Sequence, residues 1–290
     1  MKKPHDQRRD GQRRAERASE AGEKAPPRAT HWGEVADWYD GLVGEEGSEY
    51  QREVIFPGLL RLLKLEPGMR VLDLACGQGA WARKLAGLGA TVTAVDAAAA
   101  LIDAARRRNA QEKLAITYGV ADVTKLLADG KLAAPLEAGG VDAVTIVLAI
   151  QNMTPLSPVW QACRLALKPE GRLVVVMMHP SFRVPQGSDW LWEEATGTQP
   201  RLVRRYMTSA PVAIEMHPGR AAAGKGSPAT THFHRPLQAY VNTLGNAGLV
   251  VDHLDEWVSH KQSQAGPRKA ALDAARREFP MFLALRARVG

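Results

Sequence analysis

Two glycines and three carboxylates in the first half of the chain have the types and spacing of a cofactor site. Asp73 precedes Gly77 and Gly79 by four and six residues, and Asp96 and Asp122 follow farther along. The segment reads as a strand, a glycine turn, a helix and a second strand that ends on Asp96. That succession is typical of sites that bind a nucleotide cofactor against the ends of parallel strands.

The charge of Asp73 decides between two such cofactors. Read literally, Gly77-x-Gly79-x-x-Ala82 matches the dinucleotide fingerprint, with Asp96 at the distance of about 20 residues where an acid meets the ribose. A carboxylate beside a pyrophosphate would, however, be repelled by roughly 4 kcal/mol at about 4 Å. S-adenosylmethionine carries an ammonium and a sulfonium and no phosphate, so Asp73 favours it.

The segment Asp73-Leu-Ala-Cys-Gly-Gln-Gly79 resembles the first motif of the class I S-adenosylmethionine-dependent methyltransferases, in particular their type 11 small-molecule branch. The resemblance covers about residues 32 to 180. It implies an α/β, Rossmann-like, seven-stranded and mostly parallel sheet with an antiparallel last strand and a helical N-terminal cap. The resemblance also implies that Asp96 binds the ribose and that Ala121-Asp122-Val123 lies at the adenine. An insertion after strand five is expected from residues 180–231, which hold several Pro and Gly and no long periodic stretch.

The cofactor-binding residues that follow from the motif and the resemblance are Tyr39, Asp73, Ala75, Cys76, Gly77, Gly79, Asp96, Ala97, Asp122, Val123 and Leu148. Tyr39 is included because Trp38-Tyr39-Asp40 resembles a segment that reaches the methionine end of the cofactor in relatives. Structural alternatives stand beside these roles. Asp73 or Asp96 could instead cap the helix that follows it, and Asp122 could belong to an ordinary loop.

The order of expected elements fits a doubly wound sheet. Two nearly continuous apolar runs, Val141–Leu148 and Arg172–Met178, are typical of parallel strands that are covered on both faces. The other strands are expected at 69–75, Thr91–Val95, Ala115–Gly119, Leu249–Trp257 and Met281–Arg288, and the helices at Ala80–Leu88, Ala98–Asn109, near Pro158–Leu167 and from His234 to Gly248. A loop of about 23 residues is expected between the last two strands.

The chain is expected to consist of a tail and one domain, and the domain contains a cap and an insertion. Residues 1–30 hold nine Lys or Arg, five acids and almost no large apolar side chain, which predicts a disordered basic tail. A methyltransferase domain follows over 31–290, with a helical cap at 31–66 and a lid or insertion at 180–233. The tail could tether RNA, but the sequence lacks the Asn/Asp-Pro-Pro-Tyr/Phe motif after strand four, and nucleic acid is not favoured as a partner.

Acceptor residues are expected at the rim and in the insertion. Methyl transfer is an in-line displacement that needs alignment and exclusion of water, and a general base only where the acceptor must lose a proton. His179, directly after strand five, and His234 are the catalytic candidates. The substrate candidates are Gln151, Asn152, Trp190, Trp192, Tyr206 and Arg235. Each has a structural alternative: a core histidine, a satisfied loop amide, a lid's own aromatic core, or an arginine that braces the lid.

Composition limits the remaining functions. With 45% hydrophobic and 24% charged residues the chain is an ordinary globular protein, and no apolar run is long enough for a membrane span. Two cysteines provide neither a disulfide framework nor a metal site. The sequence thus predicts a cytoplasmic enzyme that methylates a small molecule at oxygen or nitrogen, without a metal, as a monomer or a homodimer. RNA methylation and a non-catalytic S-adenosylmethionine-binding module remain the alternatives.

Overall fold

The computed structural model describes residues 32, 36–133, 136, 138–215 and 229–290. The expected basic tail, residues 1–30, lies outside the described residues, as does the side chain of Tyr39. In this part of the chain no helix is long and apolar enough to cross a membrane.

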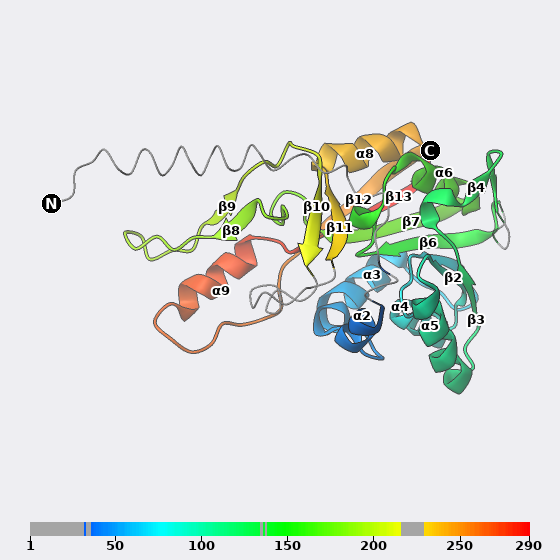
Figure 1. Ribbon diagram of the computed structural model, residues 1–290, viewed down its shortest axis with the longest axis horizontal. Helices are drawn as coiled ribbons and strands as arrows, with labels where there is room; N and C mark the ends of the chain where they lie inside the picture. Colours follow the sequence, from blue (N-terminus) through cyan, green and yellow to red (C-terminus); the bar gives the residue numbers. More distant parts are fainter. Residues whose placement is uncertain (1–31, 33–35, 134–135, 137, 216–228) are drawn as a thin grey trace.

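A seven-stranded sheet forms the centre of the molecule, in the order β12-β13-β7-β6-β1-β2-β3 (Figure 1). All pairs from β7 to β3 are parallel, whereas β13 is antiparallel to both of its neighbours. This arrangement confirms the predicted mostly parallel sheet with an antiparallel last strand. The strands are β1 (Arg70–Leu74), β2 (Thr91–Asp96), β3 (Ile116–Val120), β6 (Val141–Val147), β7 (Leu167–Met178), β12 (Leu249–Trp257) and β13 (Phe282–Val289).

Helices cover both faces of this sheet, so its strands are apolar on both sides. Figure 1 shows α6 and α8 on one side and α3, α4 and α5 on the other. Along β1, Leu72 and Leu74 join the core beneath α6 and α8, while Val71 joins the opposite core. Asp73 therefore shares the face of Val71. The helices are α3 (Phe56–Leu63), α4 (Ala80–Gly87), α5 (Ala99–Glu112), α6 (Ser157–Ala166) and α8 (Leu237–Asn246).

Two expectations about the second half of the chain are wrong in detail. The connection between the last two strands holds a helix, α9 (Lys269–Glu278), where a loop was expected. Its residues have high helix propensity, but Ala275 is its one buried residue, so its apolar pattern is faint. In addition, β7 starts at Leu167 and not at the expected Arg172, because Leu167 pairs with Val141 across a register shift. A short hairpin of β4 (Leu127–Ala128) and β5 (Lys131–Leu132) was not predicted.

The expected cap consists of α2 (Ala36–Val43), a π-helix η2 (Gln51–Ile55) and α3. Glu49, just before η2, accepts from His260 Nε2 at 2.8 Å and lies 2.7 Å from Lys261 Nζ. Tyr50 packs edge-on against His260 and hydrogen-bonds through its hydroxyl to Ser259 at 3.1 Å. The loop after β12 thus holds the start of η2 in place.

The expected insertion contains two antiparallel hairpins rather than unpatterned chain. The first pairs β8 (Ser188–Trp190) with β9 (Arg201–Val203), and the second pairs β10 (Ala210–Glu215) with β11 (Ala229–His234). Asn152 Nδ2, in the short helix η4 (Ile150–Asn152) after β6, donates to the Thr231 carbonyl at 2.9 Å. The second hairpin therefore lies over the carboxyl end of β6.

A close contact between the cap and β12 can be tested by adding one methyl group. A Cβ at Gly58 in α3 would overlap the indole of Trp257, whereas a Cβ at Gly87 in α4 would meet nothing within 4 Å. Gly58→Ala should lower the free energy of unfolding by about 1–3 kcal/mol through overpacking. Gly87→Ala, the matched control, should raise it by about 0.5–1 kcal/mol through chain entropy.

Urea denaturation at equilibrium measures both changes. Equal effects of the two substitutions would contradict the packing of α3 against Trp257.

Candidate active site

The backbone turns sharply where the two central strands end. Ala75, directly after β1, and Leu148, directly after β6, both have positive φ angles, 56° and 55°. Such left-handed conformations cost a non-glycine residue about 1–2 kcal/mol and cluster at functional sites. Gly77 and Gly79 continue the turn after β1 with φ of 56° and 80°. The carboxyl ends of β1 and β6 thus form a strained rim at the middle of the sheet.

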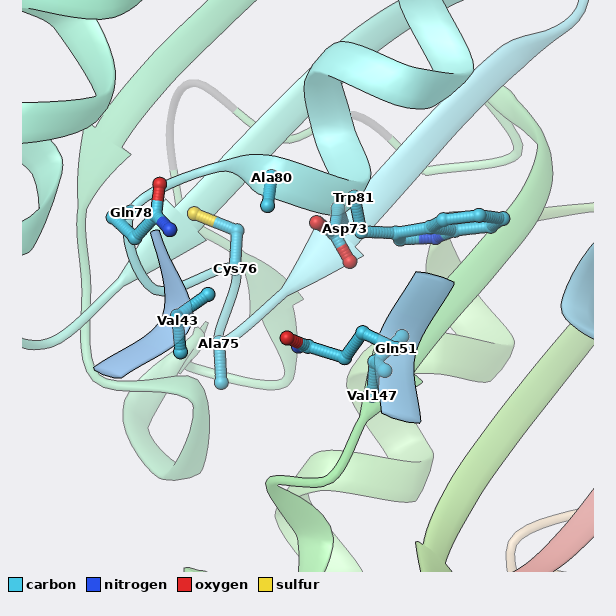
Figure 2. Close-up of a pocket in the computed structure, with 9 residues that line it drawn as sticks. All are labelled: Val43, Gln51, Asp73, Ala75, Cys76, Gln78, Ala80, Trp81 and Val147. Atoms are coloured by element: carbon cyan, nitrogen blue, oxygen red, sulfur yellow. The ribbon is translucent and has the colours of Figure 1, made fainter. Parts of the chain in front are cut away.

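Asp73 is the most constrained charged group at this rim. Its side chain is 1% exposed, and its Oδ1 accepts a hydrogen bond of 2.8 Å from Thr145 Oγ1 on β6. Its Oδ2 is buried and has no hydrogen-bond partner among the described residues. Figure 2 shows the carboxylate among the residues that line a small cavity, next to Ala75 and Cys76. A buried lone pair of this kind needs a donor or a cation.

Burial raises the pKa of Asp73 to about 7, although the Thr145 hydrogen bond opposes the shift and the nearby Asp96 adds to it. A raised pKa means that the ionised form is disfavoured in the protein without a ligand. A cation placed against Oδ2 would reverse that preference. The site is therefore electrostatically suited to a positively charged ligand.

Asp96, the last residue of β2, connects the glycine turn to α5. Its Oδ2 accepts from the Gly77 amide at 2.9 Å and its Oδ1 from the Ala98 amide at 2.8 Å. Burial raises its pKa, against these backbone hydrogen bonds. The contact with Ala98, beside the start of α5, matches the capping alternative. Each carboxylate oxygen has a second lone pair, so the same group could still accept from ribose hydroxyls.

Asp122 makes local contacts. Its Oδ1 accepts from Thr124 N at 2.9 Å and Thr124 Oγ1 at 2.7 Å, and its Oδ2 lies 3.1 Å from Lys125 Nζ. Burial pushes its pKa up, but the Thr124 and Lys125 contacts outweigh that effect and the pKa is lowered. Asp122 therefore begins a short 3-10 helix (Val123–Lys125), which is the loop role given as its alternative.

Gly79 is required for a different reason from the one expected. The motif suggests that it lets the cofactor approach the backbone. In the structure, a Cβ at this position would lie 2.6 Å from the Tyr118 hydroxyl and 3.1 Å from Ala105 Cβ. Those atoms belong to β3 and α5, behind the turn. Gly79 therefore allows the turn to pack onto its own fold.

Sequence reasoning missed the residue between the two glycines. Gln78 is 1% exposed, donates through Nε2 to the Gly44 carbonyl in the cap, and accepts at Oε1 from Arg108 at 3.0 Å. Arg108 on α5 also forms a bidentate pair with Asp40 on α2, at 2.6 and 2.8 Å. The sequence signal for Gln78 is a polar residue between the two glycines of the motif. This network, which we call the cap latch (Asp40, Gly44, Gln78 and Arg108), fixes the cap on the turn.

Arg83, on α4, adds further contacts to the cap latch. Its guanidinium donates to the Gln78 carbonyl at 2.9 Å and to the Glu45 carbonyl, and its Nε lies 3.2 Å from Glu112 on α5. Arg83 is buried on α4. Arg83 thus binds both the Gln78 carbonyl in the glycine turn and the Glu45 carbonyl just after α2.

The cavity at Asp73 is small because the cap closes it. It measures about 20 Å3, room for about one water molecule. Val43 and Gln51 from the cap form one wall and Trp81 from α4 lines it as well (Figure 2). A ligand group as large as an amino acid could enter this cavity only if the cap moved outward.

The predicted acceptor residues at η4 satisfy backbone groups. Gln151 Nε2 donates to the Leu148 carbonyl at 2.6 Å. Arg235 donates to the Met153 carbonyl at 2.8 Å and the Phe233 carbonyl at 3.2 Å. Asn152 and Arg235 tie the end of β6 to β11, which favours the structural alternatives given for them. Gln151 stays within its own turn, and its Oε1 is buried with no hydrogen-bond partner among the described residues.

Both ring nitrogens of His179 are engaged. Nδ1 accepts from the Ser181 and Phe182 amides at 3.2 and 3.4 Å, which leaves Nε2 as the donor to Glu256 Oε1 at 2.7 Å. Burial lowers its pKa, although Glu256 opposes the shift. The imidazole is therefore neutral and has no lone pair directed at a substrate. It fixes the turn after β7.

His234 is likewise buried and bonded, with Nε2 donating to the Tyr206 carbonyl at 2.8 Å. The Tyr206 hydroxyl accepts from the Leu237 amide at 3.0 Å, so both residues hold the start of α8. His232, on the same strand, is half-buried, and burial together with His234 and Arg235 lowers its pKa to about 4. It is a neutral imidazole at pH 7.

The two lid tryptophans pack within the cover. Trp190 lies edge-on to Phe279 with centroids 5.5 Å apart and beneath the Arg201 guanidinium at 4.8 Å. Trp192 lies 4.2 Å from the Arg268 guanidinium. Figure 1 shows their hairpin beside α9, away from α4. The structure thus brings the cofactor candidates together at one rim and distributes the acceptor candidates over several contacts.

The seven-stranded sheet with its β1 turn and acids at the ends of β1 and β2 defines a Rossmann-like methyltransferase fold. Residues 71–171 match the family model described as "Methyltransferase domain". The chain is 37% identical over 111 residues to a ubiquinone biosynthesis O-methyltransferase of Xanthomonas axonopodis pv. citri, which covers 38% of this chain and 44% of that protein. The chain thus spans less than half the length of the curated relatives it matches.

Solved structures match over more of the chain. An S-adenosylmethionine-dependent methyltransferase from Mesorhizobium loti is 25% identical, covers 80% of this chain and 96% of its own, and superposes with a TM-score of 0.61. One described as putative, from Listeria monocytogenes, is 21% identical over 81% of this chain and 96% of its own, with a TM-score of 0.58, and shows the fold alone. Residues 71–171 thus match a methyltransferase domain, and the chain is similar in fold to S-adenosylmethionine-dependent methyltransferases of known structure.

The raised pKa of Asp73 predicts a specific pH dependence of stability. The unfolded carboxyl titrates near 3.9, about three units below the folded one. Between about pH 4 and 7 the folded state therefore binds more protons, and this residue lowers the free energy of unfolding as pH rises, by at most about 1.4 kcal/mol per unit. Asp73→Asn should remove that part of the slope.

Urea melts of both proteins from pH 4 to 8, without ligand, measure the difference. Parallel profiles for the two proteins would contradict the burial of an ionisable, unpartnered Asp73.

Proposed function

We propose that this protein transfers the methyl group of S-adenosylmethionine to a small molecule at an oxygen or nitrogen atom. The observation that carries the proposal is the buried, unpartnered Oδ2 of Asp73 in the cavity at the end of β1. The match to the methyltransferase family model supports it, because the matched residues 71–171 include the carboxyl ends of β1, β2, β3 and β6. The first curated relatives are named as O-methyltransferases, which favours oxygen.

The residues at the rim fit that cofactor by charge and by shape. Asp73 would attract its ammonium end, directly or through water. Asp96 would accept from ribose hydroxyls while it keeps the Gly77 amide. Ala75, Cys76, Ala97, Asp122, Val123 and Leu148 would line the remainder, with Tyr39 from the cap. When bound, the cofactor supplies a methyl group already activated as a sulfonium.

The protein's own contribution would be alignment and exclusion of water. The cap latch holds α2 on the glycine turn, and Gln51 and Val43 seal the cavity. His179 is engaged at both ring nitrogens and would serve as a base only by breaking a contact, whereas His234 donates through Nε2 and keeps the Nδ1 lone pair. We propose an acceptor that reaches the site as a neutral amine or an ionised oxygen, so that neither ring has to act as a base.

We propose a small-molecule acceptor, no stable nucleic-acid partner and a cytoplasmic location, with the protein as a monomer or a homodimer. Under the RNA alternative the basic residues of the segment 1–30 would bind phosphate, and such binding weakens steeply with salt. Salt-dependent RNA retention that is lost on deleting residues 1–30 would favour that alternative.

Calorimetry with S-adenosylhomocysteine tests the cofactor site directly. Asp73→Asn and Asp96→Ala should each weaken binding by about tenfold or more, because each removes a charged group facing the ligand. Asp103→Ala, an exposed carboxylate on α5, is the control and should bind as the wild type does. Thermal melts confirm that the variants stay folded. Binding of NAD in place of S-adenosylhomocysteine would overturn the proposal.

Turnover distinguishes an enzyme from a binding module. Incubating the protein with small-molecule extract and methyl-labelled cofactor should give a labelled product by mass spectrometry. Binding of the cofactor with no labelled product from any extract would favour the non-catalytic alternative.

A further inference from the structure

Arg183 is an arginine on the rim of the sheet whose side chain has no partner among the described residues. It lies in the turn after β7, where its amide donates to the His179 carbonyl at 2.8 Å. Its side chain is half-buried, and its Nε is fully covered with no hydrogen-bond partner among the described residues. Covering a guanidinium nitrogen without an acceptor is costly unless another molecule supplies one.

Other covered arginines in the described part of the chain do have acceptors. Arg83 lies against Glu112 at 3.2 Å, Arg108 against Asp40 at 2.6 Å and Arg286 against Asp252 at 2.8 Å. Arg183 forms no such ion pair with any described carboxylate. Arg172 Nε is also buried without a partner, but Arg172 Nη1 donates to the Leu63 carbonyl at 3.0 Å, whereas no side-chain hydrogen bond of Arg183 is found among the described residues.

A second cation makes the surroundings of Arg183 more positive. Arg201 on β9 donates to the Phe182 carbonyl at 2.8 and 3.0 Å and to Ser188 Oγ at 2.7 Å, with no carboxylate within ion-pair distance among the described residues. It is near enough to Arg183 to lower the pKa of that side chain, in addition to the effect of burial. Asp189 acts electrostatically on Arg201, but no described carboxylate forms an ion pair with either cation, so an anion bound beside them would be stabilised.

The position of Arg183 relates it to the acceptor side of the cofactor cavity. The cap residue Tyr50 packs edge-on against Phe282 with ring centroids 5.8 Å apart, and the carbonyl of the preceding Met281 accepts from the His179 amide at 2.9 Å, at the start of the turn that holds Arg183. Tyr50 is followed directly by Gln51, which lines the cavity at Asp73. The cation thus stands between the cap and the first lid hairpin, at the carboxyl ends of the strands, where an open α/β sheet binds its ligands.

We propose that Arg183, supported by Arg201, binds an oxyanion of the methyl acceptor, either a carboxylate or a phosphate. This inference rests on the proposed methyl transfer. A guanidinium presents its donors in a planar fork that matches two oxygens of such a group. The opposite charges at the two ends of the site then sort the ligands: Asp73 takes the cationic cofactor, and Arg183 takes the anionic acceptor.

Binding of small anionic probes tests this assignment on the full chain. The probes are benzoate, phenyl phosphate and the neutral benzamide, measured by saturation-transfer NMR with and without S-adenosylhomocysteine. The wild type should bind at least one anion about tenfold more tightly than benzamide, and Arg183→Gln should lose that preference. Arg204→Gln, an exposed arginine that follows β9, is the matched control and should retain it.

The outcomes separate cleanly. Preference for benzoate indicates a carboxylate, preference for phenyl phosphate indicates a phosphate, and either supports the proposal when it depends on Arg183. Equal binding of benzamide, an anion preference that survives in Arg183→Gln, or no anion binding by the wild type overturns it. Arg183→Lys, which keeps the charge, should retain part of the preference and provides a second variant if Arg183→Gln fails to fold.

Failure of the proposed methyl transfer can be distinguished from failure of the role of Arg183. If the wild type does not bind S-adenosylhomocysteine, the proposed function is rejected, and the anion preference can still be measured without that ligand. An intact cofactor site with no anion preference would reject only the role of Arg183.

Discussion

The burial of Asp73 without a second partner is the constraint on which the site depends. The fold places this carboxylate at the end of the central strand, under the cap, with one hydrogen bond from Thr145. Filling the position with an apolar residue would serve packing better, since a buried carboxyl with an open lone pair destabilises the fold. A cation bound at Oδ2 would offset that cost. The ionised form of Asp73 is then disfavoured without the ligand and favoured with it.

The cap connects this charge to the rest of the molecule. Gln78 is held from one side by the cap carbonyl of Gly44 and from the other by Arg108, which also binds Asp40. Any outward movement of the cap must therefore break contacts that also order the glycine turn. Access to Asp73 and the geometry of the turn are coupled through one glutamine. A ligand that satisfies Asp73 could offset the loss of those contacts.

The local pattern of apolar residues and turn glycines predicts where the strands lie. It does not predict the tertiary contacts that explain individual residues. Apolar runs and turn glycines predict the seven strands, because parallel strands covered on both faces leave a strong signal. The signal fails for α9, where Ala275 is the one buried residue, and for Gly79, whose neighbour Tyr118 is distant in sequence. The engagement of His179 by Glu256 was equally invisible, because β12 reaches that rim only through the tertiary fold.

The form of the acceptor depends on whether a histidine can take its proton. His179 would have to leave a contact to do so, whereas His234 is buried, donates through Nε2 and keeps the Nδ1 lone pair. A neutral amine or an ionised oxygen needs no such base before transfer, since the displaced thioether leaves without protonation. Such nucleophiles depend on orientation, and an anionic anchor at Arg183 would provide it from outside the reacting atoms. Positioning by charge at both ends of the site then replaces proton transfer as the source of rate.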